Sequence, residues 1–273
     1  MEWQNAEKSY RTALKYYPMN YEARDALRDI LQQPSIFSRF RTFDIDSLIA
    51  KAPNSREFPD DPAIYLLDDC RRVVYERGGS EALYEVVIKI FNKSGIETFQ
   101  EYYIDYHPHF ELLTVEKAVV RKENGTEVKA DEDYNLLVFK SLEPGDVLHL
   151  RWKIRNYYTG ELAHHFSDKF YFNSFIPSKL GRYALLVPEK LDFHAATQNL
   201  PNRPIKNKTV DGEINEWITR NQPAIRYEYN MPPLDDVGKI LYISSMQDWQ
   251  EVVKWYEQIS RTKLESTFEI KEI

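Results

Sequence analysis

The alternation of apolar and charged residues over residues 147–158 constrains the fold most. Its apolar positions are Leu148, Leu150, Trp152 and Ile154, and basic residues occupy the positions between them. Successive side chains of a β-strand point to opposite faces, so a period of two predicts a strand with one face in a core and the other in water. Pro144 and Gly145 predict a turn just before it. The chain is therefore expected to contain a half-buried sheet with this strand near its centre.

Further strand patterns follow one another between residues 63 and 230, at the spacing of an all-β domain. They cover residues 63–75, 81–91, 97–106, 112–121, 134–139, 164–172, 182–187, 191–196, 206–210 and 213–219. Residues 92–95 are interpreted as a turn, and Asn124-Gly125 and Asp211-Gly212 predict tight hairpins because their residues accept positive φ. This many strands favours a mainly β fold built as a two-sheet antiparallel sandwich.

Residues 1–33 have the periodicity of two helices, with Pro18 between them. Ala6, Tyr10 and Ala13 lie at the relative positions of the small and aromatic residues in a tetratricopeptide repeat. One interpretation is the end of a truncated repeat array with its capping helix, which implies that the chain begins inside a longer protein. The other is an ordinary helical hairpin.

Two segments flank the predicted sandwich. Residues 34–62 form a proline-rich linker with one short helix at 44–51, which Asp44 is expected to cap. Residues 231–273 comprise an extended segment and an amphipathic helix at 246–259, with Trp249 and Tyr256 on its apolar side. That apolar side requires a surface to cover it.

Composition excludes several classes of protein. A net charge of −7 argues against nonspecific nucleic-acid binding, which needs a basic surface. The single cysteine, Cys70, excludes an intrachain disulfide and a cysteine-based zinc cluster. No apolar run approaches the roughly 20 residues of a membrane-spanning helix.

Candidate chemical groups are few. Cys70 follows two aspartates, which would raise rather than lower the pKa of its thiol, so we interpret it as structural. His107 and His109, with Glu111, have spacing that suits a metal, but the intervening proline indicates a turn. His164 and His165 are adjacent and would point to opposite faces. The acidic segment 131–133 lacks the spacing of a calcium loop and is interpreted as a solvated turn. No catalytic, cofactor-binding or metal-binding residue is assigned, and no cofactor is expected.

The charged face of the central strand is the most suggestive surface. It consists of His149, Arg151, Lys153 and Arg155, continued by Tyr157 and Tyr158. We call these six residues the basic row. A cationic row with aromatic neighbours suits an anionic glycan or an acidic protein loop. The alternative is that cross-strand carboxylates such as Glu85, Glu101 or Asp105 pair with it. Arg151 and Arg155 are expected to face solvent.

Taken in order, these landmarks resemble a bacterial family, the domain of unknown function 3857. The residues that carry the resemblance are Ala118-Val119-Val120, Asn124-Gly125, residues 142–147, Tyr171-Phe172, Val187-Pro188, Trp217, Pro223-Ala224, Glu228, Ser244, Trp249, Trp255 and Tyr256. They extend over about residues 61–260. The resemblance implies an immunoglobulin-like sandwich that precedes a transglutaminase-like, papain-type domain in a periplasmic or envelope-associated protein. It implies no catalytic residue here, because Cys70 does not match the position of that domain's cysteine.

Two functions are compatible with these patterns. The first is a noncatalytic accessory module that positions or regulates the downstream domain, with a protein partner bound through the helical repeats. The second is a carbohydrate-binding sandwich. A binding module is expected to expose coplanar aromatic rings near a polar cleft, whereas an accessory module is expected to expose an apolar patch near its C-terminal helix.

Overall fold

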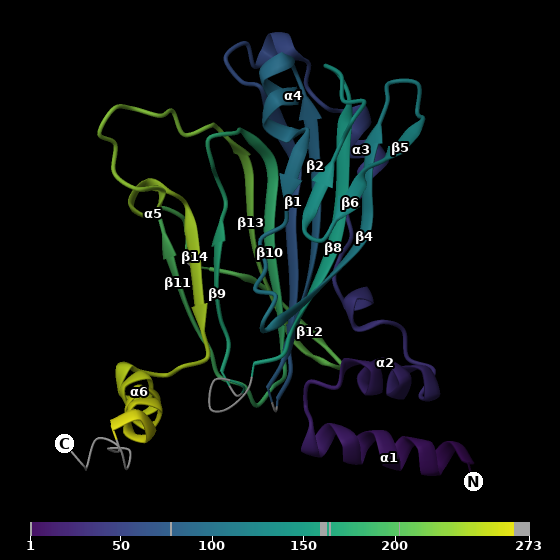
Figure 1. Cartoon of the computed structure of the whole chain (residues 1–273), viewed down its shortest axis with the longest axis vertical. Coiled ribbons are helices and arrows are strands. Elements are labelled where there is room, and N and C mark those ends of the chain that lie inside the picture. The colour runs from purple at the N-terminus through teal and green to yellow at the C-terminus, as the bar shows by residue number, and fades with distance from the viewer. Residues whose placement is uncertain (1, 77, 159–162, 164, 202, 265–273) are drawn as a thin grey trace, which may run out of the picture.

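The protein is built from one large curved sheet, two small sheets against one of its faces, and helices at its ends (Figure 1). The computed structural model describes residues 2–76, 78–158, 163, 165–201 and 203–264. Within these residues the fold is mainly β, as predicted. The sheets number three rather than two, and an immunoglobulin-like arrangement stays a prediction.

The large sheet has eight strands, all antiparallel to their neighbours except one pair. Their order is β12 (Ile205–Thr209), β13 (Gly212–Gln222), β10 (Ser178–Val187), β1 (Ala63–Val74), β2 (Ser80–Ile90), β8 (Val147–Asn156), β4 (Glu111–Arg121) and β5 (Glu127–Lys129). The exception is β1, which pairs in parallel with β10. The predicted central strand is β8, and its apolar set Leu148, Leu150, Trp152 and Ile154 is buried, as expected.

Two three-stranded sheets cover one face of the large sheet. One consists of β3 (Glu101–Tyr103), β7 (Leu136–Val138) and β6 (Asp131–Asp133), and the other of β11 (His194–Gln198), β14 (Ile240–Ser244) and β9 (Ser167–Tyr171). We call them the β3–β7–β6 sheet and the β11–β14–β9 sheet. The first packs on a core that includes Leu148 and Trp152. The second packs on a core that includes Tyr183 and Trp217.

Three predictions for this region were wrong. Residues 92–95 begin a helix, α4 (Lys93–Phe99), because the Asn92 side chain accepts a hydrogen bond from the Gly95 amide and caps it. Of the predicted strand 97–106, only residues 101–103 are extended, as β3, and residues 97–99 belong to α4. The acidic residues 131–133 form the exposed edge strand β6 rather than a turn.

The N-terminal residues form the predicted helical pair, α1 (Glu2–Tyr16) and α2 (Tyr21–Ile30). Tyr21 attaches this pair to the large sheet. Its side chain is fully buried, and its hydroxyl donates to the backbone carbonyl of Asn156 at 2.6 Å. Tyr17, between the two helices, is half exposed.

The linker lies across the other face of the large sheet. It contains the 3-10 helices η1 (Ile36–Arg39) and η2 (Ser55–Glu57) and, between them, helix α3 (Ile45–Ala50), which Asp44 caps as predicted. Phe37 and Phe40 pack on the apolar side chains of β1, β2, β10 and β13. We call residues 36–58 the strap.

Beneath the strap lies a cluster of buried charges. Arg182 on β10 donates to both carboxylate oxygens of Asp69 on β1, at 2.6 and 2.8 Å, and to Glu216 on β13 at 3.1 Å. Arg71 pairs with the same Asp69 at 2.9 Å. The strap completes the cluster, because the Arg41 carbonyl accepts a hydrogen bond from Arg182 at 2.7 Å. These contacts satisfy polar groups that would be costly to bury unpaired.

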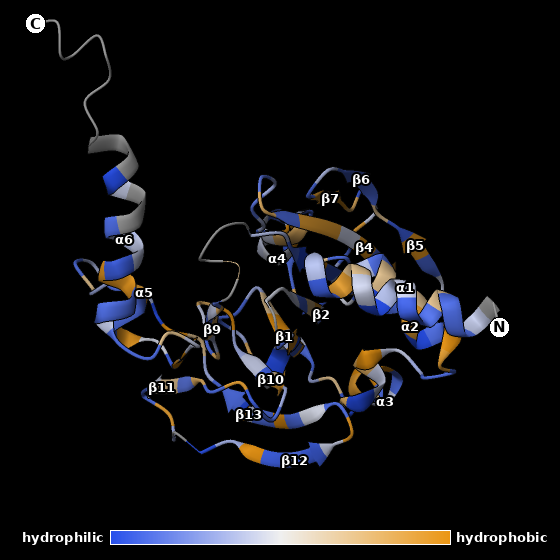
Figure 2. Ribbon diagram, turned by 90° about the horizontal axis from the view of Figure 1, so that it is seen from below, coloured by the Kyte–Doolittle hydropathy of each residue, from blue (hydrophilic) through white to orange (hydrophobic). Residues whose placement is uncertain are grey.

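The C-terminal helix stands apart from the sheets. After α5 (Leu234–Val237) and β14, helix α6 (Trp249–Leu264) extends away from the β11–β14–β9 sheet (Figures 1 and 2). Asp248 caps it by accepting hydrogen bonds from the amides of Gln250 and Glu251. Among the described helices, none is both long and apolar enough to cross a membrane.

Candidate functional site

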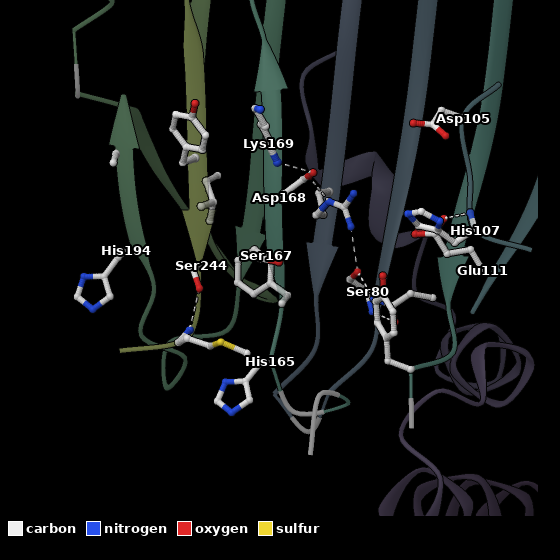
Figure 3. A pocket seen from close by; sticks show the side chains of 18 residues that line it. Ser80, Asp105, His107, Glu111, His165, Ser167, Asp168, Lys169, His194 and Ser244 are labelled. Atoms are coloured by element: carbon white, nitrogen blue, oxygen red, sulfur yellow. Dashed lines mark hydrogen bonds and ion pairs between the residues drawn. The ribbon is translucent and has the colours of Figure 1, made fainter. Parts of the chain in front are cut away.

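A cavity of about 870 Å³ opens between the β11–β14–β9 sheet and the ends of β2, β4 and β8 (Figure 3). Strands β1, β2, β8, β9, β11 and β14 contribute side chains to it, as does the segment before β4. The ionisable lining residues are Arg72, Asp105, His107, Glu111, His165, Asp168, Lys169 and His194. Clefts of this size between packed elements are typical binding sites.

A closed ionic network forms the floor of this cavity. Arg72 Nε lies 2.7 Å from Asp168 Oδ2, and the Tyr183 hydroxyl donates to the same oxygen at 2.5 Å. Arg72 Nη1 also donates to the Ser80 hydroxyl at 3.1 Å. The charges of arginine and aspartate therefore compensate each other, and their partners hold both side chains in place.

The same network reaches the N-terminal helices. The Asn156 amide donates to the Ser80 hydroxyl at 2.8 Å, while its backbone carbonyl accepts from the Tyr21 hydroxyl at 2.6 Å. A chain of hydrogen bonds thus runs from α2 through β8 and β2 to Arg72 in the cavity. The position of the helical pair is therefore connected to the position of Arg72 through these hydrogen bonds.

One wall is formed by Glu111, the first residue of β4, and by Asp105 and His107 just before this strand. Glu111 Oε2 accepts a hydrogen bond from the His107 backbone amide at 2.8 Å. On the opposite wall His194 Nε2 lies 2.8 Å from the Gln247 side chain. Within the described residues, no three histidine, cysteine or acidic side chains are grouped as a metal site requires.

The structure separates the members of the basic row. His149 is buried and its Nε2 lies 3.1 Å from Glu85, which is one of the cross-strand partners considered above. Arg155 was expected to face solvent, and that was wrong: its side chain is only 15% exposed and pairs with Glu81 and with Asp25 on α2. Lys153 lies over the Phe37 ring of the strap. The alternation identified the polar face but contained no sign that the N-terminal segment covers it.

The remaining members of the row also lie apart. Arg151 is the most exposed of the four basic residues and pairs with Glu116 at 2.9 Å. Tyr157 packs edge-on against Tyr21, with ring centroids 5.3 Å apart. Tyr158 instead lines the cavity and stacks on Phe110. That the row binds a ligand stays a prediction.

The other sequence candidates have varied positions. His107 and His165 line the cavity, whereas His109 does not belong to its lining. His164 lies outside the described residues. The structure adds His194 and Asp168 to the candidates. No sequence signal pointed to them, because they lie on strands that meet only through the tertiary fold.

Cys70 lies in the core beneath the cavity floor. Its side chain is fully buried, and burial raises the pKa of its thiol well above the usual range, with the charges of Asp168 and Asp69 acting in the same direction. The thiolate is the reactive form of cysteine. Cys70 therefore has the properties of a structural thiol.

Asp68 lies on the same face of β1 as Cys70 and Arg72, and burial, followed by the charge of Asp69, raises its pKa to about 7. Because the folded-state pKa exceeds the unfolded value of about 4, the stability linked to this group is fully present below pH 4 and is lost as pH rises to 7. We expect Asp68→Asn to stabilise the protein at pH 8 by up to about 4 kcal/mol, at about 1.4 kcal/mol per pKa unit. Urea denaturation of both proteins at pH 4 and pH 8 measures this. An equal difference at the two pH values would contradict the assignment.

Comparison with solved structures shows a related fold. A protein from Parabacteroides distasonis ATCC 8503, described as a putative protease, matches with a TM-score of 0.61 and 19% identity over 68% of this chain and 41% of that chain. An M1 zinc metallopeptidase from Deinococcus radiodurans matches with a TM-score of 0.36 and 9% identity, over 67% of this chain and 42% of that chain. The chain thus spans less than half the length of either protein.

Comparison with families supports the resemblance noted in the sequence. No curated protein matches the chain. The family model described as "Domain of Unknown Function with solved-structure structure (DUF3857)" matches residues 76–135. These residues include Ala118-Val119-Val120 and Asn124-Gly125, on which the resemblance partly rests. The segment from β2 to β6 therefore matches DUF3857, a family without an assigned function.

Proposed function

We propose that this chain is a noncatalytic accessory module that positions or regulates a transglutaminase-like domain in a longer bacterial envelope protein. In this proposal the domain follows the chain, and α6 is the element that contacts it. The sequence resemblance suggests the identity of the second domain. The fact that the chain matches only 41% of the P. distasonis protein is compatible with additional domains.

The observation that carries the proposal is the apolar side of α6. Trp249, Val253 and Tyr256 are 82%, 53% and 66% exposed, and their spacing places them on one face of the helix. Large aromatic side chains at a contact centre contribute most of the binding energy in protein interfaces. An apolar patch beside the C-terminal helix is the feature that we expected of an accessory module.

The helical pair supports a second contact. Trp3 and Tyr16 on α1 are 72% and 79% exposed. Repeat arrays bury such side chains against neighbouring repeats. We interpret α1 and α2 as the end of a tetratricopeptide array through which a protein partner binds.

The first test is to read the gene beyond Ile273, where a transglutaminase-like domain is expected; its absence would contradict the proposal. The second is hydrogen exchange on α6, in this chain and in the longer protein. We expect exchange at α6 to slow at least tenfold in the longer protein, because the second domain covers the helix. Replacing Trp249, Val253 and Tyr256 together by serine should abolish that protection.

A matched control is available on the surface. Tyr134 and Val210 are also large, apolar and highly exposed, but they belong to the β6–β7 and β12–β13 connections rather than to α6. Replacing both by serine should leave the protection of α6 unchanged. If the control lowers it as much as the α6 variant does, α6 is not the contact.

A further inference from the structure

We propose that the cavity between the β11–β14–β9 sheet and the large sheet is a binding site for a short, neutral oligosaccharide. The proposal is independent of the accessory role of α6, because none of the residues that line the cavity belongs to this helix. It rests on the shape of the cavity, the balance of its charges, its hydrogen-bonding groups and its aromatic rings.

The cavity is large and its walls are strands. Its volume of about 870 Å³ lies within the range of small-molecule sites, about 300–1,000 Å³. Side chains from seven places in the chain converge on it, as Figure 3 shows for Ser80, His107, Lys169 and Ser244. Sites on regular elements keep their geometry better than sites on loops.

The cavity has little positive charge available for an anion. Arg72 is compensated by Asp168 at 2.7 Å, and Lys169 by Asp235 at 2.6 Å. Asp105 and Glu111 remain on the wall, and they would repel an anionic ligand. A neutral ligand is not repelled by these two carboxylates. Its binding also avoids the free-energy cost of moving a charged ligand group out of water.

The uncharged lining suits a ligand with many hydroxyl groups. Ser167 and Ser244 present hydroxyl groups that donate and accept hydrogen bonds, whereas Ser80 and Asn156 are buried and already pair with each other. A sugar hydroxyl also does both, so it can pair with Ser167 and Ser244. The ring nitrogens of His107, His165 and His194 add further hydrogen-bonding atoms.

Aromatic rings supply an apolar surface beside these polar groups. Tyr158 lines the cavity and stacks on Phe110, with ring centroids 5.6 Å apart and planes inclined by 29°. Tyr242 on β14 lines the wall of the cavity that the β11–β14–β9 sheet forms. A pyranose ring has apolar C–H faces and polar edges, and an aromatic side chain beside hydrogen-bonding groups complements both.

An extended peptide fits the same cavity less well. Such a peptide would add to β9, the edge strand of the β11–β14–β9 sheet, on the side away from β14. However, the Lys169 amide already donates to the Asp168 side chain at 2.9 Å. The central donor of that edge is therefore occupied, and a ladder of peptide hydrogen bonds would be interrupted there.

The test is calorimetric titration of the whole chain with cellotriose, maltotriose and chitotriose, and with trigalacturonate as an anionic trisaccharide of equal length. At least one neutral trisaccharide is expected to bind with a dissociation constant of about 1 mM or tighter, and at least tenfold more tightly than trigalacturonate. Tyr158→Ala should weaken this binding at least tenfold. Ser167→Trp, at an exposed position on the lining, should do the same by filling the cavity.

Tyr134→Ala is the matched control, because Tyr134 is highly exposed and lies outside the cavity lining. It should bind like the parent, and melting curves should show all three variants folded. The proposal is overturned if no neutral trisaccharide binds or if trigalacturonate binds equally well. Binding that survives both Tyr158→Ala and Ser167→Trp would overturn it too.

Discussion

Replacing Arg182 by alanine is expected to destabilise the protein by about 3–5 kcal/mol. The Arg182 side chain is 0% exposed, and it holds Asp69 and Glu216 through charge-assisted hydrogen bonds. Its removal leaves the Asp69 carboxylate buried with Arg71 as its remaining cationic partner. It also frees the Arg41 carbonyl, so the strap loses a hydrogen bond to the sheet. Chemical denaturation at neutral pH measures the change in free energy of unfolding.

The matched control for Arg182 is a pair at the surface. Lys206 lies 2.8 Å from Glu213, but its side chain is 59% exposed. Lys206→Ala should cost less than about 1 kcal/mol, since water screens exposed ion pairs. If Arg182→Ala costs no more than this control, the buried cluster does not stabilise the fold as described.

Replacing Trp152 by alanine should also cost about 3–5 kcal/mol, as large aromatic truncations in cores do. Trp152 is buried between the large sheet and the β3–β7–β6 sheet. Its ring stacks on Tyr84 at 5.2 Å and contacts Tyr102 at 6.0 Å. The alanine variant would leave a cavity that these two rings cannot fill. Thermal and urea unfolding measure the loss.

Trp3→Ala provides the comparison for Trp152, because Trp3 has the same side chain and is highly exposed. Its effect should stay within about 0.5 kcal/mol, as for surface substitutions away from special contacts. A Trp152→Ala protein that unfolds at the same urea concentration as the parent would contradict the position of Trp152 in the core.

Local patterns predicted the parts of the fold that depend on local physics. The alternation in β8 identified its buried residues because one face of a sheet must leave water. Asp44 was recognised as a cap because the hydrogen bond it accepts is only three residues away. Residues 92–95 show the limit of this reasoning. An asparagine three residues before a glycine is compatible with a turn or a helix cap. The close approach of the Gly95 backbone to the Pro62 carbonyl, which leaves no room for a Cβ, is a tertiary contact that the local pattern does not contain.

The candidate cavity was not predictable in the same way. Arg72 and Asp168 lie 96 positions apart in the sequence, and their contact depends on how the β11–β14–β9 sheet docks. Nothing in the neighbourhood of either residue indicates the other. For the same reason the basic row was interpreted as a solvent-facing surface: the pattern shows that residues are polar, not which segment lies over them.

The parallel pairing of β1 with β10 has a consequence for how the chain folds. The contact between Asp69 and Arg182 spans 113 residues. A ribosome adding about 5–20 residues per second needs roughly 6–20 s to make that stretch. During this interval the hairpin of β1 and β2 is complete, but the β10 side of β1 is an open edge, and edges of this kind recruit other strands. Folding during synthesis is therefore expected to be slow and late, and a chaperone that shields β1 until residues 178–187 emerge should raise the yield of native protein.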